Sequence, residues 1–290
     1  MTDRPFDPAL LRQIEDAGLN ASAVPQQRWI DGWIVRTSPG KAKRARCIQA
    51  VAPGHGDLST RLARCEAWFA ECGLPPVFRL TPYSQPAGLA DWLEDRGWKR
   101  FDDTRVMVLE HLAEAVAGRR LGQGARGVLP PGCQEQRLDP MSYAEAIGRL
   151  RGSSAPEVAA HAHRLAHSPV PYVGLAWRRG GEVLACGQYA REGPLVGLYD
   201  VFTAPAARGQ GLAQGLCARL LRQALAEGAR SAYLQVDEAN APARAAYARL
   251  GFRDGDRYHY RSPIAAERAG DTHETGAPAG GPARGATGPG

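Results

Sequence analysis

The chain has 290 residues, of which 44% are hydrophobic and 7% aromatic, and its formal net charge is +6. This length and apolar content are sufficient for a sizeable core in one or two domains. The basic excess is spread along the chain, and the cluster that stands out is Lys41, Lys43, Arg44 and Arg46. Nucleic-acid-binding surfaces usually interleave basic and aromatic side chains, so we interpret this cluster as a solvated strand or loop and expect no nucleic-acid partner.

Two further features bear on location and metal binding. The sequence contains no basic-then-apolar leader and no apolar run of about 18 residues, the length of a membrane span. Its six cysteines form no C-x-x-C pair, so they do not indicate a zinc site. We therefore expect a cytoplasmic protein with free thiols, no bound metal and no membrane partner.

Hydrophobic periodicity divides the chain into two folded halves. In the first half we expect strands at 29–37, 46–51, 77–80 and 106–109, and helices at 58–71 and 89–95. In the second half we expect helices at 139–151, 155–167, 212–227 and 241–250, and strands at 172–177, 183–189, 195–203, 232–236 and 258–261. Strands that alternate with helices at these lengths predict an α/β protein.

Changes in composition mark the predicted domain boundaries. Residues 117–132 are rich in glycine, arginine and proline, which is typical of a linker. Residues 265–290 consist largely of glycine, alanine, proline and threonine, and we expect a disordered tail because they cannot form a core. We therefore predict one domain at 1–116 and a second at 133–264.

The turn between the strand at 195–203 and the helix that follows it could hold an anion. The first N–H groups of a helix have no partner within the helix and lie at the positive end of its dipole. Gly209 and Gly211 carry no side chain that would keep a phosphate away, and Arg208 adds a positive charge. The pattern predicts a pyrophosphate cradle, although an ordinary tight turn explains it equally well.

Three motifs in this region decide between the two interpretations. Residues 208–213 read RGQGLA, residues 240–247 read NAPARAAY and residues 250–252 read LGF. In this order they resemble the coenzyme loop, helix and helix ending of the GNAT superfamily of N-acetyltransferases, and the resemblance covers about 134–261. One departure is Ala246, where the family usually has leucine before the tyrosine.

The resemblance implies an enzyme that transfers an acetyl group from acetyl-CoA, its co-substrate, to a primary amine by direct attack. Its coenzyme residues would be Val201 and Thr203 for the pantetheine arm, Arg208, Gly209, Gly211, Leu212 and Ala213 for the pyrophosphate, and Asn240 for the coenzyme or the adjoining loop. Strand-like pairing of the pantetheine with backbone groups is a known mode of recognition.

Two residues are the predicted catalytic groups. The resemblance implies that Tyr247 protonates the departing thiolate as a general acid, and plain core packing is its alternative role. An amine is mostly protonated at neutral pH, so a base or a water relay is needed. We favour Asp200 as this base, because we expect its apolar neighbours to raise its pKa. A structural hydrogen bond is the alternative for Asp200, and Asp237 and Glu238 are interpreted as solvated loop charges.

Three histidines lie on the predicted helix at 155–167. His163 and His167 share a helix face, but no nearby cysteine or carboxylate completes a metal site. We expect solvated or pocket-lining histidines. In the family this helix pair borders the acceptor site, so the resemblance implies a role of these residues and His161 in specificity.

The first half resembles a degenerate copy of the second. When Leu80 is aligned with Leu234, Pro86 replaces Asn240 and Leu93 replaces Tyr247. The loop before the first-half helix is shorter, has no arginine and carries Asp57, whose charge should repel pyrophosphate. We therefore predict two GNAT-like domains, each a mixed, mostly antiparallel sheet flanked by helices, of which only the second binds coenzyme.

The identity of the acceptor is left open by fold and loop alone. A small metabolite, an amino acid or a protein amine would each fit, and a homodimer is compatible with the family. The alternative function is a non-catalytic acyl-CoA-binding or interaction module.

Overall fold

The computed structural model describes residues 5–118, 121 and 129–263. The predicted tail at 265–290 and most of the predicted linker lie outside these residues. The elements of the first half are α1 (Pro8–Ala21), β1 (Gln27–Ile30), β2 (Trp33–Arg36), the 3-10 helix η1 (Lys43–Ala45), β3 (Ile48–Gln49), α2 (Leu58–Glu71), β4 (Phe78–Leu80), α3 (Leu89–Glu94), β5 (Lys99–Leu109) and α4 (Leu112–Ala117). Those of the second half are β6 (Gln134–Leu138), α5 (Pro140–Arg151), α6 (Ala155–Ala166), β7 (Tyr172–Arg179), β8 (Glu182–Glu192), β9 (Leu195–Thr203), the 3-10 helix η2 (Pro205–Ala207), α7 (Leu212–Ala226), β10 (Ser231–Asp237), α8 (Ala241–Leu250) and β11 (Arg253–Ser262).

The predicted elements agree closely with the observed ones. Helices α2 and α8 and strand β9 have the predicted bounds, and Asp139 caps α5 by accepting hydrogen bonds from two N–H groups of its first turn. The strand predicted at 29–37 is instead the hairpin β1–β2, because Asp31 and Gly32 adopt φ angles of 41° and 85°. Helix α1, strand β6 and the two 3-10 helices were not predicted. Helix α1 buries mainly small residues such as Ala17, Gly18 and Ala21, which give little periodic signal.

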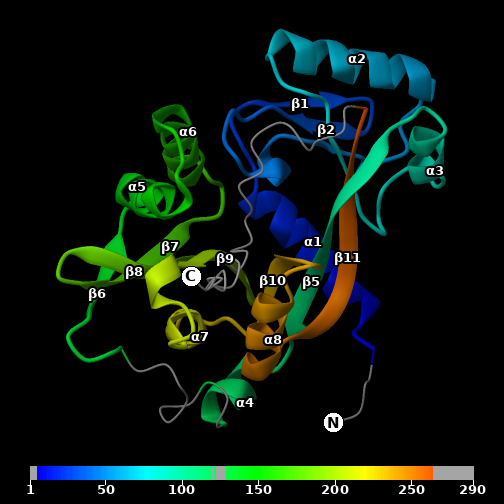
Figure 1. Ribbon diagram of the computed structural model, residues 1–290. Coiled ribbons are helices and arrows are strands. Elements are labelled where there is room, and N and C mark those ends of the chain that lie inside the picture. Colours follow the sequence, from blue (N-terminus) through cyan, green and yellow to red (C-terminus); the bar gives the residue numbers. More distant parts are fainter. Residues whose placement is uncertain (1–4, 119–120, 122–128, 264–290) are drawn as a thin grey trace, which may run out of the picture.

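The strands of both halves join in one mixed sheet. Its order is β1-β2-β3-β4-β11-β5-β10-β9-β8-β7-β6, with the first-half hairpin at one end and β6 at the other (Figure 1). Helices α5 and α6 lie together beside β7 and β8, and α7 packs against β8 and β9 (Figure 1). The largest core cluster lies beneath α7, where Leu216 and Leu220 meet Tyr189 and Leu198 of the sheet.

The last strand of each half is exchanged into the other half. Strand β5 pairs antiparallel with β10 from Thr104 to Leu109, and β11 pairs antiparallel with β4. The two exchanged strands also pair with each other at the centre of the sheet. The predicted domain boundaries remain a prediction, but the sheet of each half includes a strand from the other.

The predicted solvated basic cluster lies instead between the two halves. Lys41 forms an ion pair with Glu157 of α6 at 3.4 Å, and Lys43 pairs with Asp102 of β5. The guanidinium of Arg44 lies 5.4 Å from the centre of the Tyr199 ring on β9. These residues are partly exposed as well as paired, so the loop is less solvated than expected, because it packs against the second half.

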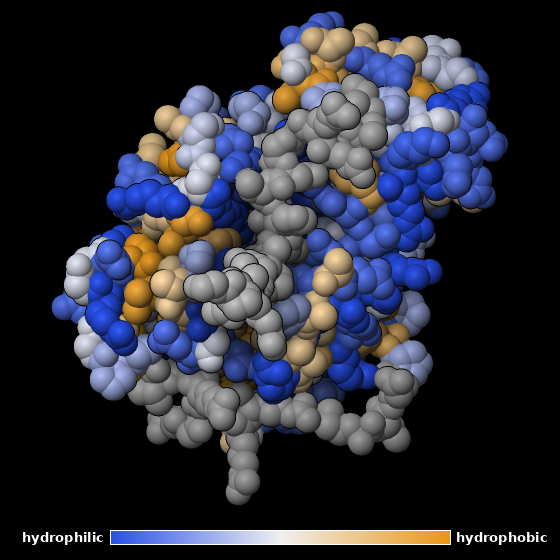
Figure 2. Space-filling model, in the orientation of Figure 1, coloured by the Kyte–Doolittle hydropathy of each residue, from blue (hydrophilic) through white to orange (hydrophobic). Residues whose placement is uncertain are grey.

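Most side chains on the face of the molecule shown in Figure 2 are hydrophilic. Among the described residues, the large hydrophobic side chains that are exposed are Trp29 and Met141. No helix in the described part of the chain is long and apolar enough to cross a membrane.

Strand exchange predicts that the second half cannot fold well by itself. A fragment of residues 133–263 would lack β5, so β10 would lose its antiparallel partner and expose an unpaired edge. We expect this fragment to aggregate or to lose cooperative thermal unfolding, measured by circular dichroism and size-exclusion chromatography. A control fragment of residues 5–263 retains both exchanged strands and should unfold cooperatively. Cooperative unfolding of the shorter fragment would contradict the dependence on β5.

Candidate active site

A cleft opens where β9 and β10 separate. These parallel strands pair from Leu195 and Ser231 to Leu198 and Leu234. Beyond that point β9 continues to Thr203 and β10 to Asp237, but the two strands no longer pair with each other. The cleft between them has a volume of about 750 Å³. It is lined by every predicted site residue: Asp200, Val201, Thr203, Arg208, Gly209, Gly211, Leu212, Ala213, Asn240 and Tyr247.

The start of α7 at this cleft has the features of an anion site. Gly209 and Gly211 adopt φ angles of 77° and 76°, which favour glycine. Gly211 stands at the N-cap position of α7 and has no side chain to accept a hydrogen bond, so the start of α7 is uncapped. A Cβ added at either glycine would meet no atom within 4 Å, so open space lies beside the loop. The first N–H groups of α7 therefore have no side-chain acceptor from the cap, beside the cationic Arg208. A diphosphate fits this arrangement.

The first-half counterpart of this loop is filled by the chain's own carboxylates. Asp57 caps α2 through the N–H of Thr60 at 2.8 Å. Asp31 accepts the N–H groups of His55 at 2.9 Å and Gly56 at 2.8 Å. These backbone hydrogen bonds lower the pKa of Asp31 and of Asp57, so both are anions at neutral pH. Loop N–H groups that already hold a carboxylate are poorly placed to hold a phosphate.

The cleft edge of β9 offers polar groups to an extended ligand. On its other edge β9 pairs with β8, where Thr203 lies opposite Ala185 and Phe202 opposite Cys186. On the cleft edge β9 has no partner strand beyond Leu198. The Thr203 hydroxyl is buried and has no hydrogen-bond partner in the described part of the protein. An extended chain of amides could satisfy both kinds of group.

Helix α8 presents the remaining two predicted residues. The Asn240 side chain caps α8 by accepting the N–H of Ala243 at 3.1 Å. Tyr247 packs edge-on against Phe252, with ring centres 6.1 Å apart. Burial raises the pKa of Tyr247, which keeps its hydroxyl protonated. No hydrogen bond of this hydroxyl occurs among the described residues, and Tyr247 is among the residues that line the cleft.

Asp200 lies at a β-bulge where β9 leaves β10. Its φ angle is +50°, and the pairing shifts between Cys186–Phe202 and Gln188–Tyr199, so two residues of β9 lie opposite one of β8. The Tyr143 hydroxyl of α5 donates to the Asp200 carbonyl at 2.9 Å. Aspartate tolerates a positive φ better than most residues, and the bulge turns its side chain away from the sheet toward α5 and α6.

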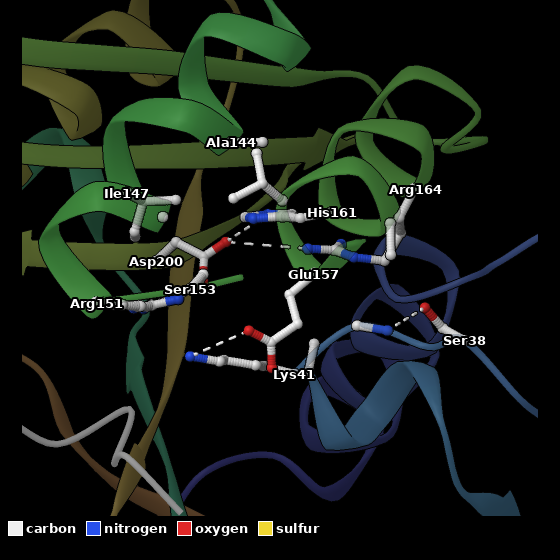
Figure 3. Close-up of a pocket in the computed structure, with 15 residues that line it drawn as sticks. Ser38, Lys41, Ala144, Ile147, Arg151, Ser153, Glu157, His161, Arg164 and Asp200 are labelled. Carbon is white, nitrogen blue, oxygen red and sulfur yellow. Dashed lines mark hydrogen bonds and ion pairs between the residues drawn. The ribbon is translucent and has the colours of Figure 1, made fainter. Parts of the chain in front are cut away.

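Arg151, His161 and Arg164 lie around the Asp200 carboxylate (Figure 3), and the Gln188 amide also contacts it. Arg151 Nη1 donates to it at 3.0 Å and Gln188 Nε2 at 2.7 Å. His161 Nε2 lies 3.3 Å away without hydrogen-bond geometry, and Arg164 lies 3.9 Å away. Burial by itself raises the pKa of Asp200, but Arg151, His161 and Arg164 outweigh burial and hold this pKa well below its usual value.

The expected rise in the pKa of Asp200 is therefore wrong. Its chain neighbours Tyr199 and Val201 are apolar, but the groups that determine its charge come from α5, α6 and β8. A carboxylate with a depressed pKa is a weak proton acceptor. The role of Asp200 in catalysis remains a prediction.

The other candidate bases and the two remaining histidines have partners of their own, different from those of Asp200. Asp237 lines the cleft and accepts the N–H of Ala239 at 2.7 Å, and Glu238 pairs with Arg105 of β5. His163 and His167 are exposed with ring centres 4.1 Å apart, so of the three histidines it is His161 that lines a pocket. Among the described residues no group of three potential metal ligands lies together.

Two family models match the two halves of the chain. Residues 142–252 match the model described as "Acetyltransferase (GNAT) family", and residues 9–120 match the one described as "Probable histone acetyltransferase Rv0428c C-terminal". The chain belongs to the GNAT family of acetyltransferases. As a GNAT protein it is an acyl-CoA-dependent N-acetyltransferase, with acetyl-CoA as the co-substrate that the family implies.

Similar proteins share this organisation along most of the chain. A relative from Bacillus subtilis, described as the uncharacterized N-acetyltransferase YobR, is 25% identical over 252 residues, which are 87% of this chain and 98% of the relative. A solved GCN5-related N-acetyltransferase from Kribbella flavida has a TM-score of 0.61 at 18% identity, over 87% of this chain and 95% of that chain. A solved tandem GNAT protein from the clavulanic acid biosynthesis pathway has a TM-score of 0.55 at 15% identity, over 72% of this chain and 70% of that chain. These structures show that the fold is shared.

Several residues of this GNAT site were not found from the sequence. Tyr143, Arg151 and Gln188 hold Asp200 and its bulge, and the loop that begins at Ser38 reaches the site from the first half. Their residue types and spacing carry no motif. These residues can be found only when it is known that α5 and the first-half loop fold against strand β9, which carries Asp200.

Asp200→Asn tests the charge balance of this network. Asparagine tolerates the positive φ and keeps the size of the side chain, but it leaves Arg151 and Arg164 without their buried anion. We expect the free energy of unfolding at pH 7 to fall by roughly 3 kcal/mol, a usual cost of breaking a buried ion pair.

The pH dependence provides the control for this variant. Because the folded-state pKa of Asp200 lies below its unfolded-state value, ionised Asp200 stabilises the fold at every pH above about 4, and that stability is lost as the pH falls through the folded-state pKa. The difference between the two proteins in urea unfolding should therefore shrink as the pH falls below about 4. A difference that stays constant or grows below that pH would contradict this assignment.

Proposed function

We propose that this GNAT protein transfers the acetyl group of acetyl-CoA to a primary amine by direct attack of the amine on the thioester. The observation that carries the proposal is the cleft between β9 and β10, which opens beside the uncapped start of α7. Bound acetyl-CoA supplies an activated acetyl group. The direct test is release of thiol from acetyl-CoA in the presence of a library of amines.

The proposed coenzyme contacts divide the cleft in two. Backbone N–H groups near Gly211 and the charge of Arg208 would hold the pyrophosphate. The unpaired edge of β9 at Val201 and Thr203 would bind the pantetheine amides in the manner of an added strand. The full set would be Val201, Thr203, Arg208, Gly209, Gly211, Leu212, Ala213 and Asn240. Asn240 would act by fixing the start of α8.

Two proton movements complete the reaction. Tyr247 is proposed to protonate the leaving thiolate, since it lines the cleft and its hydroxyl stays protonated without a hydrogen-bond partner among the described residues. The attacking amine must lose a proton, and the depressed pKa of Asp200 favours a water relay over direct abstraction by its carboxylate. Asp200 would then act as a positioning residue that holds the bulge and Arg151 at the cleft.

Gly211→Glu tests the pyrophosphate cradle, with Gly211→Ala as the matched control. Both variants place a side chain at a positive φ, but glutamate alone adds a carboxylate beside the free N–H groups. We expect the glutamate variant to bind acetyl-CoA at least tenfold more weakly than the alanine variant, a difference of about 1.4 kcal/mol by calorimetry. The unaltered chain should bind one acetyl-CoA, because Asp31 and Asp57 occupy the first-half loop. Equal affinities of the two variants would argue against the cradle.

Tyr247→Phe tests the general acid. This change removes one oxygen and keeps the ring on Phe252, so turnover should fall by roughly 10²-fold while acetyl-CoA affinity stays within a few-fold. Tyr189→Phe is the control, because its buried hydroxyl donates to Glu227 at 2.7 Å and does not line the cleft. The control should lower the melting temperature and leave turnover unchanged. Normal turnover of the Tyr247 variant would assign the proton to another group.

The same assays separate an enzyme from a binding module. A protein that binds acetyl-CoA with one site and releases no thiol with any amine would be a non-catalytic acyl-CoA-binding protein. Thiol release that depends on an added amine supports transfer.

A further inference from the structure

A second, smaller cavity adjoins the coenzyme cleft. It has a volume of about 50 Å³ and lies between the first-half loop 38–42 and helices α5 and α6 (Figure 3). Arg151 and Asp200 line both the cavity and the cleft, whereas the α7 loop lines the cleft alone. The cavity therefore opens at the end of the site away from the proposed pyrophosphate position, where an acceptor must approach.

The first half builds one wall of this cavity. Ser38 is buried, and a Cβ added to Gly40 would lie 3.6 Å from that of Ala160, so the loop packs directly on α6. Lys41 reaches Glu157 of α6 at 3.4 Å. Arg44, three residues further on, lines the adjoining cleft over the Tyr199 ring. The acceptor end of the site is therefore made by both halves.

This end of the site carries an excess of positive charge. Three cationic side chains line the cavity, Lys41, Arg151 and Arg164, against the two carboxylates Asp200 and Glu157. Asp200 already accepts hydrogen bonds from Arg151 and Gln188. Glu157 accepts the Ser154 N–H at 2.8 Å as well as pairing with Lys41. Neither carboxylate remains to attract a further cation.

The sign of this charge discriminates between classes of amine. The acetyl group and the pantetheine arm are uncharged, so the coenzyme gives no reason for cations at this end. Polyamines and lysine-rich protein tails carry additional positive charges, which the cluster would repel. An amine that also carries a carboxylate would place its acid group near the cations, where a charge-assisted hydrogen bond is strong.

We propose that the acceptor is a small amine bearing a carboxylate, and that Lys41 of the first half is a specificity-determining residue that recognises this acid group. The inference rests on the proposed acetyl transfer and assigns the first half a task in it: to complete the acceptor pocket. The amine would lie toward the cleft and the carboxylate toward loop 38–42.

Matched pairs of amines test the acceptor class. Each pair is an amino acid and the amine formed by its decarboxylation, such as alanine with ethylamine and phenylalanine with phenethylamine, and spermidine is included as a polyamine. We expect kcat/KM for thiol release to favour the acid-bearing member of each pair by at least about tenfold. Calorimetric titration of the same amines into the CoA-loaded protein measures the preference without turnover.

Two variants of the basic loop localise the preference. Lys41→Gln should reduce the preference for the acid-bearing amine by about tenfold, mainly through KM. Lys43→Gln is the control, because Lys43 pairs with Asp102 and lines neither the cavity nor the cleft. Melting temperatures of both variants verify that the fold is retained.

The outcomes separate this inference from the proposed function. Equal or better use and binding of the decarboxylated amines or of spermidine would overturn the inference while leaving acetyl transfer intact, and so would equal effects of the two lysine variants. Failure of the protein to bind acetyl-CoA would overturn the proposed function and the inference together. A preference for the carboxylate that Lys41→Gln weakens and Lys43→Gln does not would support it.

Discussion

The antiparallel pairing of β5 with β10 supports the cleft of the second half. Beyond Leu234, β10 has lost β9 as a neighbour, yet its other edge stays hydrogen-bonded to β5 as far as the pair Asp237–Thr104. A strand with no partner on either side would expose its backbone groups and bend freely. The first half therefore contributes the strand that keeps one wall of the cleft in place, and β11 returns an equivalent strand to the first half.

A single bulge connects the acceptor end of the site to its support. Asp200 takes the strained backbone position, and Tyr143 and Gln188 hold its carbonyl and carboxylate from two different elements. Arg151 and Arg164 bring positive charge to the same point from α5 and α6, and His161 lies beside them. Strained backbone of this kind persists where the surroundings fix it and is common at functional sites. Here it fixes the position at which the cleft meets the second cavity.

The two halves use one loop geometry in opposite ways. Before α7, two glycines leave the helix start open and uncapped, so an external anion can reach it. Before α2, Asp57 caps the helix and Asp31 from the β1–β2 turn takes the loop N–H groups. In the first half the chain's own carboxylates satisfy the N–H groups that a phosphate would use. The first half contributes to the second half the strand β5 and the loop that carries Lys41, which packs on α6.

The sequence by itself determined the elements whose signals are local. Periodicity and local conformation within about a dozen residues were enough to predict helices α2 and α8, strand β9 and the glycine turn before α7. The family resemblance likewise rests on short motifs. Only the tertiary structure decided the strand exchange, the packing of the basic cluster against the second half and the depressed pKa of Asp200. The reason is that burial and electrostatic energy sum over neighbours in space, and Arg151 lies far along the chain from Asp200. Apolar neighbours in sequence predicted a raised pKa, but the cations that lower it come from other elements of the fold.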